Sequence, residues 1–280
     1  MKTPGDAAPL DSAIISSSLA KLEGVLGPMK SVAVAFSGGV DSALLLGVAR
    51  RVLGHEGVLA VTARSPTSAG HELETAVRLA SELDAVHLVI ESFEMQDPEF
   101  VKNLADRCYI CKKGRFSAIL KIARQRGAAF VVDGSNIDDR SDFRPGMKAI
   151  EELGVRSPLM EAGLCKSDIR LLARHLGLSI WNKPAYACLA TRIPCASPIT
   201  VQKLERIDAC EDLVRTMAVS GQVRVRDYGD TARIEVAVED LAKLVDSKVR
   251  GVLTAFFKAR GFRFVTLDLE GYSMGSTNRA

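Results

Sequence analysis

The sequence predicts a doubly wound α/β domain followed by a smaller α+β domain. Over roughly the first 180 residues, short apolar runs alternate with segments of helical spacing. A glycine-rich turn, residues 37–42, joins the first apolar run to a helix-like segment. After residue 198 the pattern changes to a long helix, two neighbouring short strands and a second helix. Parallel strands linked by helices form doubly wound sheets, whose ligands bind at the carboxyl ends of the strands.

The composition is that of an ordinary globular core. The 280 residues are 47% hydrophobic and 25% charged, with a formal net charge of +3. No apolar stretch is long enough for a membrane span, and the N-terminal residues lack an apolar signal region. We therefore expect a cytoplasmic protein, in which the six cysteines serve metal binding or thiol chemistry rather than disulfides. The mild charge argues against a nucleic-acid partner, and the lack of a long apolar stretch argues against a membrane partner.

A polar, flexible tail is expected at residues 1–10 and the α/β domain at 11–180. Each expected strand is apolar and short, as for burial on both faces of a parallel sheet. The expected strands are 31–36, 57–62, 85–90 and 129–132. The expected helices are 11–26, 43–53, 70–83, 111–125 and 166–176, where apolar residues recur at helical spacing.

Residues 181–198, with three prolines, are expected to form a linker that carries Cys188. The C-terminal α+β domain, 199–280, is expected to bind substrate or to mediate oligomerisation. Its expected helices are 201–217 and 238–258, and its expected strands are 223–226, 231–236 and 262–267.

The turn after the first strand has the composition of a phosphate cradle. It reads Ser37-Gly38-Gly39-Val40-Asp41-Ser42. Glycines let the backbone approach an anion, and the first N–H groups of the following helix point toward it. The spacing resembles the PP-loop of ATP pyrophosphatases and not a Walker A motif. A tight turn in which serine and aspartate act only as caps is the alternative. We expect Asp41 to help hold Mg²⁺.

A second polar segment follows the strand at 129–132. Gly134 is expected to admit a nucleotide close to the strand end, and Arg144 to contact ATP. The carboxylates of Asp138 and Asp139 are either Mg²⁺ ligands or caps in a polar loop.

Two cysteines lie one helical turn apart, Cys108 and Cys111, and a third, Cys188, lies in the linker. Three thiolates favour a 4Fe-4S cluster with one open iron, whereas structural zinc normally takes four ligands. Reactive thiols without metal, zinc and plain packing stay open as alternatives, and Cys195 stays open as a further ligand. Cys210 and Cys165 are expected to be small core residues.

In the C-terminal domain, Arg224 and Arg226 alternate along one strand, which places both guanidinium groups on one face. Glu235 lies on the next expected strand. We expect the arginines to hold a phosphate and the glutamate to orient them. A surface ion pair is the alternative.

Taken together, the motifs resemble the LarE family of ATP-dependent sulfur transferases over residues 13–278. They are the PP-loop, 107–113, 133–136, 143–146, 182–194, 223–226 and 265–269. The resemblance implies adenylation of a carboxylate on pyridinium-3,5-biscarboxylic acid mononucleotide, then thiolation with release of AMP. It implies ATP, Mg²⁺ and a small nucleotide substrate. Asp41, Cys188 and Arg192 are the expected catalytic residues.

One branch of that family gives up the sulfur of a cysteine that aligns with Ala187, and it lacks the Cys-x-x-Cys pair. The other carries three cysteines matching Cys108, Cys111 and Cys188, which hold a 4Fe-4S cluster, and this chain resembles that branch. Two departures stand out. Cys195-Ala196 replaces a frequent Tyr-Gly, and Ser273 replaces a frequent arginine.

Two other functions stay open at this stage. One is tRNA thiolation, which uses the same adenylation and requires a strongly basic RNA-binding region. The other is a non-catalytic nucleotide-binding or redox module. A homo-oligomer and a sulfur-donating partner also stay open.

Overall fold

The computed structural model describes residues 9–140, 145–184, 186–217 and 219–273. The chain forms two compact units. The first unit comprises residues 1–65, 70–94 and 108–185, and the second comprises 66–69, 95–107 and 186–280. Two short segments from the first half of the sequence thus belong to the second unit.

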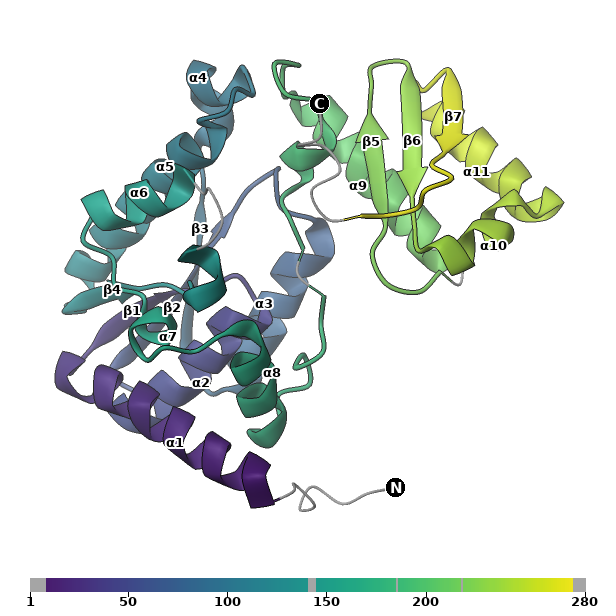
Figure 1. Cartoon of the computed structure of the whole chain (residues 1–280). Helices are drawn as coiled ribbons and strands as arrows, with labels where there is room; N and C mark the ends of the chain where they lie inside the picture. The colour runs from purple at the N-terminus through teal and green to yellow at the C-terminus, as the bar shows by residue number, and fades with distance from the viewer. Residues whose placement is uncertain (1–8, 141–144, 185, 218, 274–280) are drawn as a thin grey trace. The chain divides into compact units, whose positions relative to one another are not determined.

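The first unit contains a parallel four-stranded sheet (Figure 1). Its strands are β1 (Val32–Ala35), β2 (Val58–Arg64), β3 (Val86–Glu91) and β4 (Phe130–Val132). Their order is β3-β2-β1-β4, and Val32 pairs with Val58 on one side and Phe130 on the other. The chain reverses its winding direction between β1 and β4, which is where ligands bind in such sheets.

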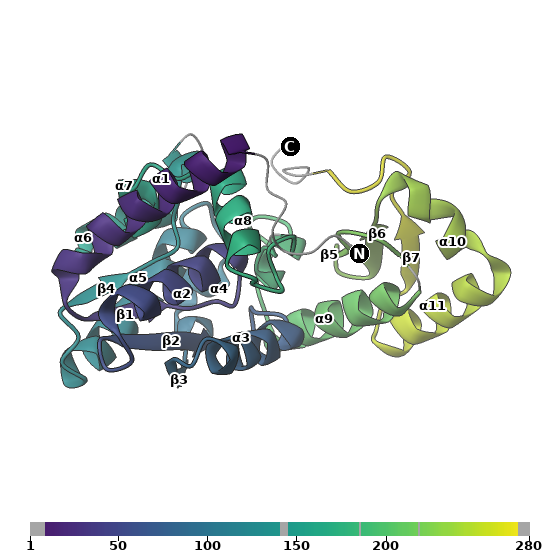
Figure 2. The same ribbon diagram turned by 90° about the horizontal axis from the view of Figure 1, so that it is seen from below.

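Helices cover both faces of this sheet (Figure 2). One face packs against α1 (Pro9–Leu26), α2 (Val40–Leu53), α3 (Gly70–Glu82) and α8 (Lys166–His175). The other packs against α5 (Arg107–Gln125) and α6 (Pro145–Glu152). Alternate β1 residues serve the two cores, because Val34 contacts the first group and Ala33 the second. The doubly wound prediction is confirmed.

Some predicted details are wrong. The strand expected at 85–90 is β3, which lies at the sheet edge with Val86 and Val89 exposed, rather than buried on both faces. The sequence prediction also misses the short helices α4 (Pro98–Val101) and α7 (Pro158–Glu161), as well as α6. Helices of one or two turns leave too few apolar repeats for a periodicity to be recognised.

The second unit contains a mixed three-stranded sheet. Its strands, β5 (Arg224–Asp227), β6 (Thr231–Glu235) and β7 (Phe264–Leu267), follow in that order. β5 and β6 are antiparallel, and β6 and β7 are parallel. The sheet packs against α9 (Val201–Thr216) and α11 (Ser247–Ala259) through residues that include Val214, Val225 and Phe257.

The helix predicted at 238–258 is broken into η5 (Val238–Asp240), α10 (Leu241–Val245) and α11. The break lies at Asp246, whose backbone is extended. Its carboxylate accepts the N–H groups of Lys248 at 3.0 Å and Val249 at 3.3 Å. Asp246 therefore starts a new helix as an N-cap, a role that aspartate favours over a helix interior.

The segment predicted as a linker packs within the second unit from residue 186 onward. Leu189 N–H donates to the Thr67 carbonyl at 2.7 Å, and Ala196 N–H donates to the Asn103 carbonyl at 3.0 Å. The buried Asn103 amide also donates to the Pro194 carbonyl at 2.8 Å. The segment that carries Cys188 is thus tied to residues 66–69 and 95–107 by backbone and amide hydrogen bonds.

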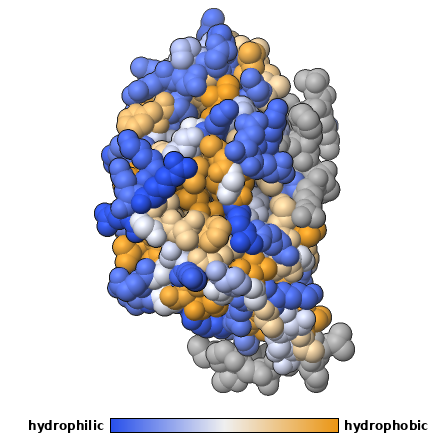
Figure 3. All heavy atoms as spheres, turned by 90° about the vertical axis from the view of Figure 1, so that its left-hand side faces the viewer, coloured by the Kyte–Doolittle hydropathy of each residue, from blue (hydrophilic) through white to orange (hydrophobic). Residues whose placement is uncertain are grey.

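Within the described residues, no helix combines the length and apolar character needed to cross a membrane. On the face shown in Figure 3, small groups of hydrophobic residues lie between hydrophilic ones.

Candidate functional site

The PP-loop turn connects β1 to α2, as predicted. Ser37 and Ser42 meet with their hydroxyl oxygens 3.2 Å apart, and Ser42 Oγ donates to the Gly39 carbonyl at 3.1 Å. Gly39 is the N-cap of α2 and provides no side-chain cap. The turn therefore holds itself in shape while the start of α2 keeps N–H groups available for an anion.

Two glycines make this turn sterically possible. Gly38 has φ +73°, and a Cβ there would lie 3.0 Å from Cα of Ala76 in α3. A Cβ on Gly134, which follows β4, would lie 3.0 Å from the backbone nitrogen of Ser42. Any side chain at either position would displace the turn. Gly134, which the sequence analysis expects to contact ATP, therefore lies beside the start of α2.

Asp41 lies in the first turn of α2 with partners on two other segments. Asn136 Nδ2 donates to Asp41 Oδ1 at 3.3 Å, and Lys166 Nζ donates to Asp41 Oδ2. The Asp41 side chain is 23% exposed, so a cation can reach it. Lys166 is a site residue that the sequence prediction missed, because its distance of 125 positions from Asp41 leaves no local signal.

The hydrogen bonds of the acidic loop after β4 favour the alternative in which Asp138 and Asp139 act as caps. Lys166 N–H donates to Asp138 Oδ2 at 2.8 Å, which fixes the start of α8. Asn136 N–H donates to Asp139 Oδ2 at 3.0 Å. The buried Asp133 accepts hydrogen bonds from the hydroxyls of Ser135 and Ser157, both at 2.6 Å. These carboxylates shape the loop around Asn136, while the predicted ATP contact Arg144 lies outside the described residues.

The cysteines expected as cluster ligands form no disulfide in the described part of the chain. Cys108 is exposed and Cys111 half-buried, both in the first two turns of α5 in the first unit. Cys188 is half-buried in the second unit, as N-cap of η4 (Leu189–Arg192). By contrast, burial raises the pKa of Cys210 to about 12. Cys210 is a core residue as predicted, but the half-buried Cys165 is the N-cap of α8 instead.

Arg192, an expected catalytic residue, is buried beside the cysteine segment. It is 1% exposed and pairs with the buried Glu211, with Nε 2.8 Å from Oε1. Its Nη1 donates to the carbonyls of Ala187 at 2.7 Å and Cys188 at 3.1 Å. Arg192 therefore fixes the backbone that carries Cys188.

Glu211 was missed by the sequence prediction. It also accepts the N–H of Val225 at 3.0 Å and Arg215 Nη2 at 2.9 Å. One signal could have found it. It shares the buried face of α9 with Leu204, Ile207 and Val214, where a carboxylate needs a cationic partner.

The arginines of β5 are buried and differ in their partners. Arg226 makes three hydrogen bonds of 2.8–3.0 Å to the carboxylate of Glu235, and its Nη1 donates to the Thr191 carbonyl at 2.9 Å. Arg224, 2% exposed, donates to the Val223 carbonyl at 2.8 Å and forms no ion pair with any described carboxylate. The pair of Arg226 with Glu235 is thus not a surface ion pair.

Burial lowers the pKa of Arg224, and the nearby charges of Arg192 and Arg226 act in the same direction. The charge of Glu211 acts in the opposite direction, although no ion pair joins it to Arg224. A buried cation without an ion-pair partner is unfavourable unless other groups stabilise it.

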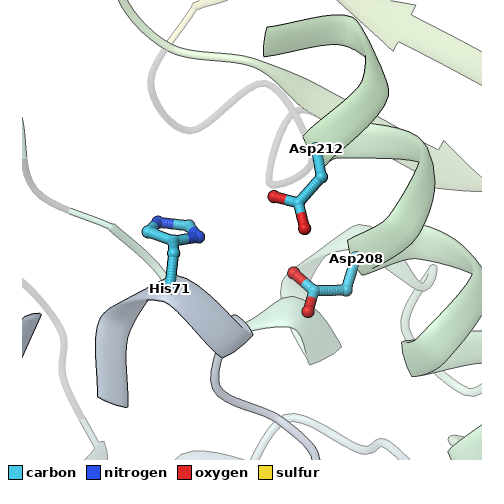
Figure 4. Close-up of side chains that lie close together, drawn as sticks. All are labelled: His71, Asp208 and Asp212. Atoms are coloured by element: carbon cyan, nitrogen blue, oxygen red, sulfur yellow. The ribbon is translucent and has the colours of Figure 1, made fainter. Parts of the chain in front are cut away.

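His71, on α3 in the first unit, is shown in Figure 4 together with Asp208 and Asp212, which lie one turn apart on α9 in the second unit. These side chains therefore define no metal site.

Comparison with known proteins agrees with this geometry. The NAD synthase family model matches residues 20–130. An uncharacterized protein of Synechocystis is 40% identical over 95% of this chain and 98% of its own length. The pyridinium-3,5-bisthiocarboxylic acid mononucleotide synthase of Lactiplantibacillus plantarum is 37% identical over 95% of both chains. An uncharacterized protein of Methanocaldococcus jannaschii is 32% identical over 87% of this chain and 91% of its own.

Proposed function

Because this chain belongs to the family of the Lactiplantibacillus plantarum pyridinium-3,5-bisthiocarboxylic acid mononucleotide synthase, we propose that it is an ATP-dependent sulfur transferase. Its substrate would be pyridinium-3,5-biscarboxylic acid mononucleotide, and its product a thiocarboxylate. The observation that carries the proposal is the glycine-rich turn after β1, with Asp41 beside it. This turn lies where the winding direction of the chain reverses between β1 and β4. The family consists of ATP-utilising enzymes. The alternative of a non-catalytic nucleotide-binding or redox module is therefore not pursued.

Activation of the carboxylate is the first step. A carboxylate oxygen attacks the α-phosphorus of ATP, the bond from that phosphorus to the bridging oxygen breaks, and pyrophosphate leaves. Ser37, Gly38, Gly39 and Ser42 would hold the departing phosphates through N–H and hydroxyl groups. Asp41 would hold Mg²⁺, which neutralises their charge. Gly134 and Arg144 would contact the rest of ATP.

Sulfur then attacks the carbonyl carbon and AMP leaves with the electrons of the carbon–oxygen bond. Adenylation makes this possible because AMP is a far better leaving group than oxide. Arg224 and Arg226 would hold the phosphate of the mononucleotide, with Glu235 orienting Arg226. Arg192 would keep the Cys188 backbone in place during the exchange.

For the source of sulfur, Cys108, Cys111 and Cys188 fit the donor set of a 4Fe-4S cluster. None of the three forms a disulfide in the described structure, and the first two lie one turn apart on one helix. When bound by three cysteines, such a cluster leaves one iron open to carry sulfide. The rival source is direct donation by Cys188, which leaves dehydroalanine.

Anaerobic purification with iron analysis, followed by intact-protein mass spectrometry after turnover, separates these sources. Cys108→Ala, Cys111→Ala and Cys188→Ala should each lose iron and thiocarboxylate formation, while pyrophosphate release in the adenylation step persists. Cys195→Ala, at an exposed thiol outside the set, is the matched control and should behave as wild type. An active, iron-free protein that becomes about 34 Da lighter after one turnover would contradict the cluster proposal.

The alternative of tRNA thiolation is tested in the same assay. Incubation with ATP and tRNA should give no thiolated nucleoside, whereas the mononucleotide should give a thiocarboxylate. The reverse outcome would replace the proposed substrate.

A further inference from the structure

Two tyrosine rings lie over the same buried guanidinium group. The Cζ atom of Arg224 is 5.1 Å from the ring centroid of Tyr272 and 5.8 Å from that of Tyr186. Both distances are within the range of cation–π contacts. Among the described residues, Arg224 has no carboxylate partner and one hydrogen-bond acceptor, the Val223 carbonyl. All of these residues belong to the second unit.

Arg224 differs from the neighbouring Arg226 in its hydrogen-bond partners. Arg226 donates from Nε and Nη2 to Glu235 and from Nη1 to the Thr191 carbonyl. A carboxylate on Arg224 would likewise occupy some of its donors and would leave fewer N–H groups for an incoming phosphate. An aromatic face attracts the cation without accepting its N–H groups in strong hydrogen bonds. The donors of Arg224 therefore stay available to an anion.

The backbone fixes Tyr272 in this place. Gly271 has φ +73°, and a Cβ there would lie 2.9 Å from the Val236 carbonyl oxygen. Tyr272 N–H donates to the same carbonyl at 2.8 Å. The glycine thus permits a sharp turn that holds the tyrosine against the end of β6.

Tyr186 lies on the cysteine-bearing segment, two residues before Cys188. Arg192 binds the carbonyls of Ala187 and Cys188, and Arg226 binds that of Thr191. One tyrosine at the Arg224 guanidinium therefore comes from the C-terminal segment and the other from the segment that carries a sulfur ligand.

We propose that Tyr186 and Tyr272 are positioning residues that hold the Arg224 guanidinium group in place and leave its N–H donors for the substrate phosphate, and that Tyr186 links the occupied phosphate position to the Cys188 segment. This inference rests on the proposed function. Loss of the Tyr272 ring weakens binding of the nucleotide. Loss of the Tyr186 ring alone has two effects. It weakens binding of the nucleotide, and it lowers the yield of thiocarboxylate per AMP, because the cysteine segment is no longer aligned with the bound substrate.

The test compares Tyr272→Phe, Tyr272→Leu and Tyr186→Leu with wild type in a steady-state assay of AMP formation. The phenylalanine variant keeps a ring and should retain the wild-type KM. Each leucine variant should raise KM for the mononucleotide by about 5- to 30-fold and leave KM for ATP unchanged. The matched control is Tyr228→Leu, because Tyr228 lies over Arg233, an arginine already paired with Glu235. It should leave both KM values unchanged.

Leucine variants with unchanged KM for the mononucleotide, or with equal increases for both substrates, overturn the proposal. So does a Tyr186→Leu variant with the wild-type ratio of thiocarboxylate to AMP. Calorimetric titration with inorganic phosphate separates this inference from the proposed function. If wild type releases no AMP but binds phosphate more tightly than Tyr272→Leu does, the anion site stands and only the proposed reaction fails. If wild type does not bind phosphate, or if both bind equally, the proposal is overturned.

Discussion

The two units contain two candidate anion sites of opposite design. In the first unit, the cradle between β1 and α2 offers backbone N–H groups, hydroxyls and glycines, and its carboxylate, Asp41, is partly exposed. In the second unit, the candidate phosphate site is made of buried arginines, among them Arg224 and Arg226. The first uses an open helix end that costs little to leave empty, because water can hydrate it. The second uses charges that must be compensated inside the protein.

Because one candidate site is exposed and the other buried, the two should contribute differently to the stability of the fold. Removing one partner of a buried ion pair leaves an uncompensated charge, whereas an exposed pair contributes little. Changes at the cradle should therefore alter chemistry with little effect on folding. Changes at the arginine centre should alter both.

The largest expected effect is that of Asp41→Ala. It should lower AMP formation by at least about 100-fold, because the magnesium that neutralises the departing pyrophosphate loses its protein ligand. The free energy of unfolding should change by less than about 1 kcal/mol, since the contact with Lys166 is partly exposed. Glu91→Ala, which removes the exposed pair with Arg64, is the control and should retain activity. Normal AMP formation by Asp41→Ala would remove the cradle from the mechanism.

The next largest effects distinguish the two arginines. Arg224→Lys should raise KM for the mononucleotide by about tenfold or more, because a lysine cannot reproduce the planar donor fork. Arg226→Ala should also destabilise the fold by up to about 3 kcal/mol, since the buried Glu235 would keep only the partly exposed Arg233 as its partner. Urea unfolding and steady-state kinetics measure the two quantities. Ordinary kinetics for lysine variants at both 224 and 226 would reduce this centre to a structural ion-pair cluster.

A pH-dependent contribution is expected in the first unit from Glu94. Burial would raise the pKa of this carboxyl, but the charge of Arg115 and hydrogen bonds from Ser65, Ser92 and Arg115 outweigh it and lower the pKa to about 2. A depressed pKa stabilises the fold above the unfolded value near 4.5, and this stabilisation is lost as the pH falls toward about 2.

Glu94→Gln should therefore flatten the loss of stability between about pH 5 and pH 2. Thermal unfolding across this range measures it. If the stability of the variant falls with pH as that of wild type does, another carboxylate is responsible for the loss of stability in acid. Because Arg115 lies one turn after Cys111 on α5, iron content of the same variant reports whether this pair also holds the cysteine helix in place.

The smallest expected effect concerns Ala196, where the family often has glycine. Its φ is +61°, a conformation in which a Cβ is unfavourable. Ala196→Gly should raise the free energy of unfolding by up to about 1 kcal/mol and leave both KM values unchanged. A destabilised variant would mean that the alanine methyl contributes packing in the cysteine segment that outweighs the strain.

The sequence predicted the cradle far better than the arginine centre, for a physical reason. The cradle depends on six consecutive residues whose backbone geometry follows from glycine and helix capping, so its parts are visible together. In the arginine centre, Glu211 pairs with Arg192, 19 positions away, and the rings of Tyr186 and Tyr272 meet at Arg224. Such contacts depend on how helices and strands pack, which local spacing does not record.

The same contrast holds for the fold. The alternating pattern of strands and helices predicted the parallel sheet and the position of the PP-loop at its carboxyl edge. It did not predict that β3 is an exposed edge or that Asp246 divides the last helical region, because edge position and capping are decided by neighbouring elements.

The central claim, that a carboxylate is activated by transfer of AMP, is tested most directly with pyridinium-3,5-biscarboxylic acid mononucleotide labelled with oxygen-18 in its carboxylates. Attack of a carboxylate oxygen on the α-phosphorus, followed by sulfur attack on carbon, must leave one labelled oxygen in the phosphate of AMP. We predict AMP that is heavier by one such oxygen for each thiocarboxylate formed. Unlabelled AMP, or ADP as the nucleotide product, would contradict the account.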